Sequence, residues 1–128
     1  MIRKASCCCG PCSVDVQGEP DINAICHCSN CKRRTGSAFG WSTYFADDGV
    51  VGRSGDFDVY SIARGNQRCW FCAVCGSTLL WKSDGQPGRT GIAGGCFVDP
   101  PLPEPTVTVS NDGRCTWLDL PSAWRTSL

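Results

Sequence analysis

The cysteines constrain this chain more than any other residue type. Twelve of its 128 residues are cysteine, a density typical of a disulfide scaffold in a secreted protein or of metal ligation in a reducing compartment. No apolar segment of about 7–15 residues precedes the first cysteines, so no secretory signal is visible. We therefore expect reduced cysteines in a cytoplasmic protein, with a secreted, disulfide-linked chain as the alternative.

The cysteines are grouped at the short spacings that metal sites use. The groups are Cys7, Cys8, Cys9 and Cys12; Cys26, Cys28 and Cys31; and Cys69, Cys72 and Cys75, with Cys96 and Cys115 alone. Two thiolates two to four positions apart can reach one zinc ion, and a second such pair completes a tetrahedron. Disulfide partners follow no such spacing rule. The grouping therefore favours metal ligation.

Residues 72–76, Cys-Ala-Val-Cys-Gly, are typical of a zinc knuckle, in which a glycine follows the second ligand. A knuckle needs a partner pair from another part of the chain. The N-terminal group offers Cys7 with Cys9, which is followed by Gly10, or Cys9 with Cys12. Spacing alone leaves both pairs open.

The middle group, Cys26, Cys28 and Cys31, has no fourth cysteine or histidine at knuckle spacing. Structural zinc sites have four protein ligands, whereas catalytic sites keep three and leave one position for water or substrate. We therefore predict an open three-cysteine site. In the alternative interpretation, one of the spare cysteines closes it, namely Cys8, Cys12, Cys69, Cys96 or Cys115.

Two further cysteine patterns are not assigned a function. Residues 9–12 read Cys-Gly-Pro-Cys, as in thioredoxin, but the residues that follow alternate like a strand and no βαβ unit surrounds them. Residues 69–75 match the start of a ferredoxin cluster motif, but position 79 is Leu79 rather than a fourth cysteine. Neither redox chemistry nor an iron–sulfur cluster is expected.

Polar residues surround the middle group. With a strand-like local structure, Cys26 and Cys28 would share one face and His27 the other, so His27 is expected to support the ligands or lie at the surface. Residues 32–34, Lys-Arg-Arg, either balance the charge of a metal–thiolate group, which we favour, or anchor a substrate carboxylate.

The rest of the chain predicts a mostly β fold in a single domain over residues 1–128. Fifteen glycines and eight prolines interrupt nearly every helical window. Expected strands cover residues 13–17, 22–26, 39–45, 57–62, 67–71, 78–82, 90–93 and 106–109. The proline-rich residues 99–105 are an extended connector to the C-terminal tail, because proline lacks the N–H that a helix or central strand requires.

Charge and hydropathy exclude two classes of partner. Twelve Lys and Arg balance twelve Asp and Glu, so the chain has no overall positive field for nucleic acid or anionic lipid. Its apolar runs are far shorter than the roughly 18 residues that a membrane span needs. We expect neither a nucleic acid nor a membrane partner.

Three motifs together resemble the glutathione-dependent formaldehyde-activating enzyme family, which also includes relatives of centromere protein V. They are C-x-C-G at residues 7–10, C-H-C-x-x-C-K-x-x-T-G at residues 26–36 and F-C-x-x-C-G at residues 71–76. Their order and spacing cover residues 6 to about 82 of the sequence. The resemblance implies a β-tent-like fold and two zinc ions per chain. It implies a structural zinc on Cys7, Cys9, Cys72 and Cys75, and a catalytic zinc on Cys26, Cys28 and Cys31.

The resemblance also implies a carbon–sulfur lyase that joins a small thiol, such as glutathione, to formaldehyde or another aldehyde. Zinc with three thiolates polarises water poorly but can bind a thiol and remove its proton, so thiol activation fits better than hydrolysis. His27, Tyr44 and Thr35 are candidate proton donors by their chemistry. The alternative is a zinc-stabilised binding module, with two structural zinc sites and a protein partner.

Overall fold

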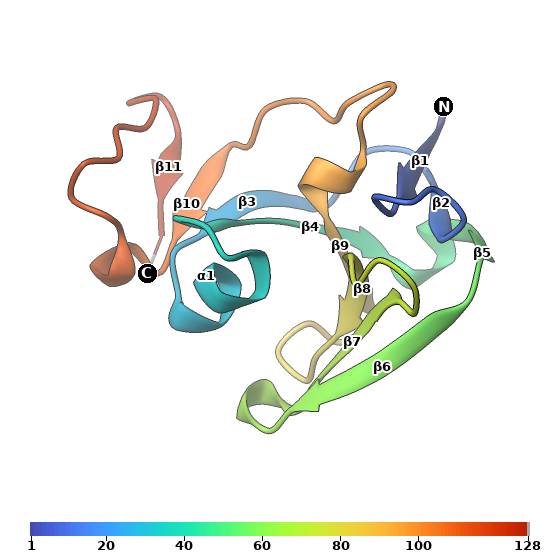
Figure 1. Cartoon of the computed structure of the whole chain (residues 1–128). Helices are drawn as coiled ribbons and strands as arrows, with labels where there is room; N and C mark the ends of the chain where they lie inside the picture. The colour runs from blue at the N-terminus through green and yellow to red at the C-terminus, as the bar shows by residue number, and fades with distance from the viewer. Residues whose placement is uncertain (128) are drawn as a thin grey trace.

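The structure is a computed structural model that describes residues 1–127. It contains a three-stranded sheet in the order β1-β2-β5 and an eight-stranded sheet in the order β11-β10-β3-β4-β9-β8-β7-β6 (Figure 1). The strands of the small sheet are β1 Ile2–Ser6, β2 Ser13–Gln17 and β5 Val50–Ser54. Those of the large sheet are β3 Ile22–Cys26, β4 Gly40–Ala46, β6 Phe57–Ile62, β7 Gln67–Cys72, β8 Thr78–Lys82, β9 Arg89–Ala93, β10 Val107–Val109 and β11 Arg125–Thr126. The expected mostly β fold is confirmed.

The main core fills the space between the small sheet and one face of the large sheet. Val14 and Val16 of β2 are fully buried there with Phe45 of β4 and Ile92 of β9. Successive residues of a strand point to opposite faces of a sheet. Tyr44, the neighbour of Phe45, accordingly belongs to a second cluster around Trp81. The large sheet therefore has two packed faces.

The second face carries the principal helix of the fold, α1 Ser29–Thr35, which Figure 1 shows beside β3 and β4. Cys28 caps its N-terminus by accepting a hydrogen bond from the Cys31 N–H, and Gly36 ends it in the left-handed region, with φ of 64°. The guanidinium of Arg34 lies 4.4 Å from the centre of the Trp81 ring. The helix is thereby fixed over the second cluster.

All eight expected strands are present, with bounds that differ by at most one residue from those expected. The helix α1 was not anticipated, because its seven residues are too few to show a clear apolar period. The strand-like geometry expected at residues 26–28 was also wrong, because β3 ends at Cys26 and Cys28 already caps α1. Three strands, β1, β5 and β11, were not anticipated.

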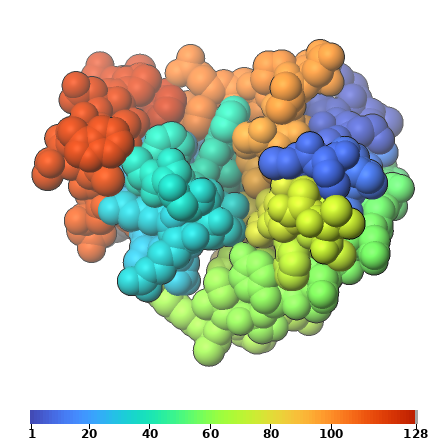
Figure 2. Space-filling model, in the orientation of Figure 1, coloured from blue at the N-terminus to red at the C-terminus, as the bar shows by residue number. Residues whose placement is uncertain are grey.

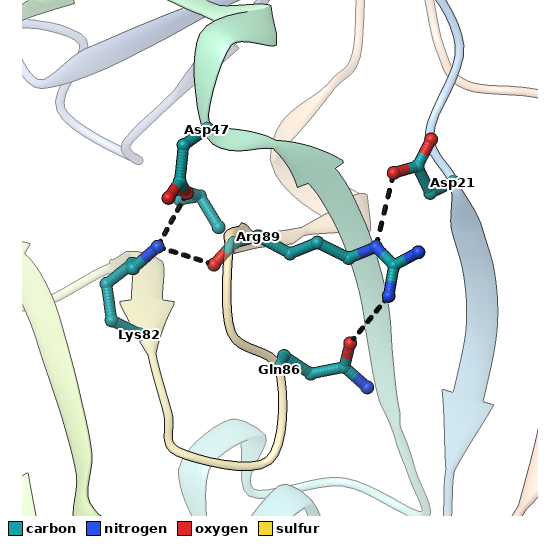
Figure 3. A network of polar contacts seen from close by, with 6 residues as sticks. Asp21, Asp47, Lys82, Gln86 and Arg89 are labelled. Carbon is teal, nitrogen blue, oxygen red and sulfur yellow. Dashed lines mark hydrogen bonds and ion pairs between the residues drawn. The ribbon is translucent and has the colours of Figure 1, made fainter.

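A polar network holds the turn between β8 and β9 against the ends of β3 and β4 (Figure 3). The Nζ of Lys82 donates to Oδ1 of Asp47 at 2.5 Å and to the carbonyl of Arg89 at 2.7 Å. The Nε of Arg89 donates to Asp21 at 3.2 Å, and its Nη1 donates to Gln86 at 3.3 Å. These contacts position a turn that lines the cavity described below.

Residues 99–105 form no helix and no strand of either sheet, and they carry the chain from the short helical turn Gly94–Cys96 towards β10. The Nδ2 of Asn23 donates to the carbonyls of Pro103 at 2.9 Å and Glu104 at 3.2 Å. Side-chain donors thus replace strand pairing along this segment. The segment delivers β10 parallel to β3, with Val109 opposite Cys26.

A substitution at Gly91 tests how closely Trp81 packs on the second face of the large sheet. A Cβ at this position would lie 2.1 Å from Nε1 of Trp81, so we expect Gly91→Ala to lower the free energy of unfolding by about 1–3 kcal/mol or more. Gly85→Ala is the control, because a Cβ there meets no atom within 4 Å. Urea unfolding of the metal-loaded proteins measures the difference. Equal midpoints for the two variants would contradict this packing.

Candidate metal centres

Four cysteine side chains from two distant turns come together at the junction of the two sheets. Cys7 and Cys9 lie in the turn between β1 and β2, whereas Cys72 ends β7 and Cys75 lies in the turn that leads to β8. All four sulfur atoms lie within 4.8 Å of one another. The Sγ of Cys9 is 3.7 Å from that of Cys7 and 3.6 Å from that of Cys72. The partner of the Cys72–Cys75 knuckle is therefore the pair Cys7 and Cys9, and not the pair Cys9 and Cys12.

Backbone N–H groups point at these sulfurs. The N–H groups of Val74 and Cys75 donate to Sγ of Cys72, each at 3.4 Å, and the N–H of Cys12 donates to Sγ of Cys7 at 3.4 Å. Each turn is completed by a glycine with positive φ, 104° at Gly10 and 80° at Gly76. Glycine adopts this conformation without steric cost, so the glycine after each pair has the role expected of it.

The geometry of this group fits zinc. A tetrahedron with Zn–S bonds of about 2.3 Å has sulfur atoms about 3.8 Å apart, which is close to the 3.6 and 3.7 Å found here. A disulfide would need about 2.05 Å, and all twelve cysteines are free. Hydrogen bonds from Ser77 lower the pKa of Cys75 to about 5, and that of Cys72 is lowered by the Cys75 and Val74 N–H groups. Donors that stabilise thiolates favour metal binding.

The second group forms at the corner between β3 and α1. Cys26 is the last residue of β3, Cys28 is the N-cap of α1, and Cys31 lies in the first turn of the helix. Their sulfur atoms lie within 4.8 Å of one another. No further His, Cys, Asp or Glu of residues 1–127 joins them at that distance. The group therefore offers three ligands to a metal ion.

The electrostatics of this group favour a thiolate at Cys26. A hydrogen bond with Cys31 lowers the pKa of Cys26 to about 5, and the same hydrogen bond raises the pKa of Cys31. The N–H of Cys31 also donates to Sγ of Cys28 at 3.4 Å. One sulfur thus carries negative charge while its neighbour holds the shared proton. Three soft sulfur donors of this kind suit zinc.

A cavity of about 420 Å³ opens beside the three-cysteine group. Its walls include all three cysteines, Asn30 of α1, and Ser42 and Tyr44 of β4. Arg64 of the short helical turn before β7 and Gln86 of the β8–β9 turn complete the lining. The volume is within the range typical of small-molecule sites, roughly 300–1,000 Å³.

The three candidate proton donors lie in different surroundings. Tyr44 lines the cavity, and its hydroxyl accepts a hydrogen bond from Nε1 of Trp81 at 3.1 Å. Burial raises the pKa of Tyr44, so its phenol keeps its proton. Thr35 instead donates to the carbonyls of Cys31 at 2.9 Å and Phe39 at 3.1 Å. Of these two residues, only Tyr44 lines the cavity.

His27 is not a surface residue. It is fully buried, and its Nε2 lies 2.8 Å from Oγ1 of Thr108. Burial lowers its pKa. Its ring contacts Phe39 edge-on, and its side chain is absent from the lining of the cavity beside the three cysteines. His27 therefore braces the corner rather than facing a substrate.

None of the spare cysteines completes the three-cysteine group. Cys12 lies beside the four-cysteine group and its thiol donates to the carbonyl of Asp56 at 3.3 Å, while burial raises its pKa to about 11. Cys69 is fully buried in the second cluster, near Tyr60. The remaining spare cysteines, Cys8, Cys96 and Cys115, also lie outside the group.

Comparison with known proteins places the chain in a family. Residues 2–111 match the family described as glutathione-dependent formaldehyde-activating enzyme. This match covers most of the chain, and the chain belongs to that family. The family description indicates an enzyme of formaldehyde activation. The two cysteine groups of this chain are compatible with zinc.

A solved structure, that of a Rhodobacter sphaeroides protein determined as a structural genomics target, is similar to this fold. The TM-score is 0.58 at 21% sequence identity, and the alignment covers 73% of this chain and 86% of that chain. This likeness shows a shared fold. Comparison with curated proteins gives no significant match. Among the described residues, no helix has the length and apolarity that crossing a bilayer requires.

The two cysteine groups predict the amount of bound metal. We expect two metal ions per chain, and native mass spectrometry against a denatured sample counts them. Cys28→Ser should remove one ion because it leaves only two sulfurs at its group. Cys115→Ser is the control and should leave two ions, since Cys115 belongs to neither group. A chain without metal, or a single ion, would contradict two centres.

Proposed function

We propose that this protein is a zinc-dependent carbon–sulfur lyase that activates a small thiol for reversible addition to formaldehyde or another aldehyde. The observation that carries the proposal is the three-cysteine group, which has no fourth protein ligand among residues 1–127 and borders a cavity of about 420 Å³. A closed structural site would have four protein ligands. Membership of the formaldehyde-activating family supports the same chemistry.

The proposal gives the two cysteine groups different roles. Cys7, Cys9, Cys72 and Cys75 would hold a structural zinc that joins the two sheets. Cys26, Cys28 and Cys31 would hold a catalytic zinc. Zinc bound there supplies a fourth coordination position that accepts a thiol sulfur and lowers its pKa.

The residues of the chain orient the reactants and supply the proton. In the forward direction, a carbon–sulfur bond forms between the thiol sulfur and the aldehyde carbon, and the C=O π electrons move to oxygen. That oxygen takes a proton from the Tyr44 phenol. The thiol releases its own proton to the solvent when it binds, and a proton from the solvent then restores the Tyr44 phenol. Trp81 holds the Tyr44 hydroxyl in place at 3.1 Å. The reverse sequence splits the thiohemiacetal.

The first test concerns the difference between the two cysteine groups. Cys72→Ser should unfold or insolubilise the protein, because binding of a structural zinc supplies folding free energy on the order of 10 kcal/mol. Cys28→Ser should remain folded, because β3 and α1 keep their own hydrogen bonds. Circular dichroism and soluble yield compare the two variants. Equal unfolding of both would mean that both centres are structural, and would favour a zinc-stabilised binding module.

The second test measures the reaction. NMR exchange between free and thiol-bound formaldehyde, with glutathione and smaller thiols, should be faster with the protein than in buffer. Tyr44→Phe should slow the exchange about 10²-fold by removing the proton donor, while the metal count and thiol binding are unchanged. Cys28→Ser should abolish the acceleration. A wild-type protein that accelerates exchange for no thiol, although it holds both metal ions, would refute the proposal.

A further inference from the structure

Arg34 is a half-buried cation that forms an ion pair with no Asp or Glu among residues 1–127. Its Nη2 atom is inaccessible to solvent and has no hydrogen-bond partner in the described part of the chain. The ion pairs of the described residues involve Arg3, Lys4, Lys82 and Arg89, and none involves Arg34. A buried donor of a charged group is costly when it has no partner. The surroundings of Arg34 therefore favour an anionic ligand.

The position of Arg34 is fixed relative to the three-cysteine group. It follows Cys31 by three residues on α1, so the two side chains lie on neighbouring turns of one helix face. The point that a Cβ would occupy on Gly40 lies 2.8 Å from Nη2 of Arg34 and 3.4 Å from Sγ of Cys31. An anion bound to the guanidinium of Arg34 would thus lie close to a substrate held at the three sulfurs.

The nearby cysteines make no hydrogen bond with Nη2 of Arg34, and neither does any other sulfur atom of the described residues. Of the two other cations on this part of α1, Lys32 donates from Nζ to the carbonyl of Gly113, and Arg33 is exposed. Charge balance within the metal–thiolate group, which the sequence favoured for residues 32–34, stays a prediction for Arg34.

A hollow beside Arg34 gives a ligand access to it. A second cavity, of about 390 Å³, is lined by Asn30, Arg33 and Arg34 of α1 and by Tyr60 and Thr78 of the facing strands. Asn30 also lines the cavity of the three-cysteine group, so the two cavities adjoin there. Figure 2 shows the hollow between the cyan segment that contains α1 and the green segment of β6 and β7. None of the described Asp or Glu residues lines either cavity.

We infer that Arg34 binds the carboxylate of the substrate thiol, and that the enzyme is specific for thiols that carry a carboxylate a few bonds from sulfur. The inference rests on the proposed function, because it places the thiol sulfur at the three-cysteine group. A guanidinium binds a carboxylate through two parallel N–H donors. The Trp81 ring centre lies 4.4 Å from the guanidinium carbon of Arg34, and Arg34 lines the second cavity, where a ligand can reach it. Arg34 is thus a specificity-determining residue.

A matched pair of thiols tests the specificity. 3-Mercaptopropionate and its methyl ester share the sulfur and the carbon chain, but only the first carries a negative charge. Calorimetry with the zinc-loaded protein should show about tenfold tighter binding of the acid, the value for one charge-assisted pair. Arg34→Gln should remove the preference and leave ester binding unchanged. Arg34→Lys should keep part of it, because lysine retains the charge but not the planar donors.

Arg68→Gln is the control for this test. Arg68 also stacks on a tryptophan, at 5.9 Å from the Trp70 ring, and lines neither cavity. The Arg68→Gln variant should retain the preference for the acid over the ester. Equal binding of acid and ester by the wild-type protein would overturn the inference, as would a preference that survives Arg34→Gln. Should Arg34→Gln fail to fold, the wild-type protein and the Arg34→Lys variant still decide, because an undiminished preference in Arg34→Lys would also overturn it.

A ligand without sulfur separates this inference from the proposed function. Propionate should shift the Trp81 indole N–H resonance of the wild-type protein saturably, and this shift should be lost in Arg34→Gln. If propionate binds while neither thiol does, the carboxylate site stands and thiol activation is wrong. If both thiols bind equally and propionate causes no shift, thiol binding stands and the role of Arg34 is refuted.

Discussion

The fold depends on the meeting of two cysteine turns at the junction of its sheets. The β1–β2 turn belongs to the small sheet and the β7–β8 turn to the large one, and they are joined by four sulfurs within 4.8 Å of one another. The N–H of Cys8 also donates to Oγ of Ser77 at 3.0 Å across the same junction. Small domains with limited cores often rely on such a link. The contacts at this junction bring the turn of the small sheet against the turn of the large sheet.

The three-cysteine group requires a particular path of the backbone. Three sulfurs within six residues can converge only if the chain turns sharply, and here it passes directly from a strand into a helix. Neighbouring residues pack tightly against that corner. His27 is buried beneath it. Gly113 approaches so closely that a Cβ there would lie 2.4 Å from the carbonyl oxygen of His27. Substrate access and a tight corner are compatible because the three cysteines line the cavity whereas His27 does not.

The sequence predicted the strands well because apolar alternation and turn residues mark them. The missed elements lack that signal. Arg3 occupies an inward position of β1, where it is buried and pairs with Glu19 at 3.1 Å, so the strand does not alternate in polarity. In β5, Gly52 pairs with Asp15, next to the register shift between Asp15 and Val16, and glycine indicates a turn more often than a strand. Cysteine spacing found both groups, and residues 32–34 directly follow the second of them in the sequence. Tyr44 was a candidate by its chemistry alone, and only the fold places it beside the three cysteines, since no spacing rule links it to them.

The corner at Cys26–Cys31 is braced from behind by a chain of polar contacts that reaches the C-terminal strands. Oγ1 of Thr108 lies 2.8 Å from His27 and donates to Asn111 at 2.7 Å, while Nδ2 of Asn111 donates to the carbonyl of Ser127 at 2.9 Å. The N–H of His27 also donates to the carbonyl of Val109 at 3.2 Å. Because Cys26 and Cys28 flank His27, the contacts that hold this residue also restrain the stretch of backbone that carries two of the three sulfurs. The C-terminal segment, which contributes no cysteine to either group, therefore helps to set the geometry at which the three sulfurs meet.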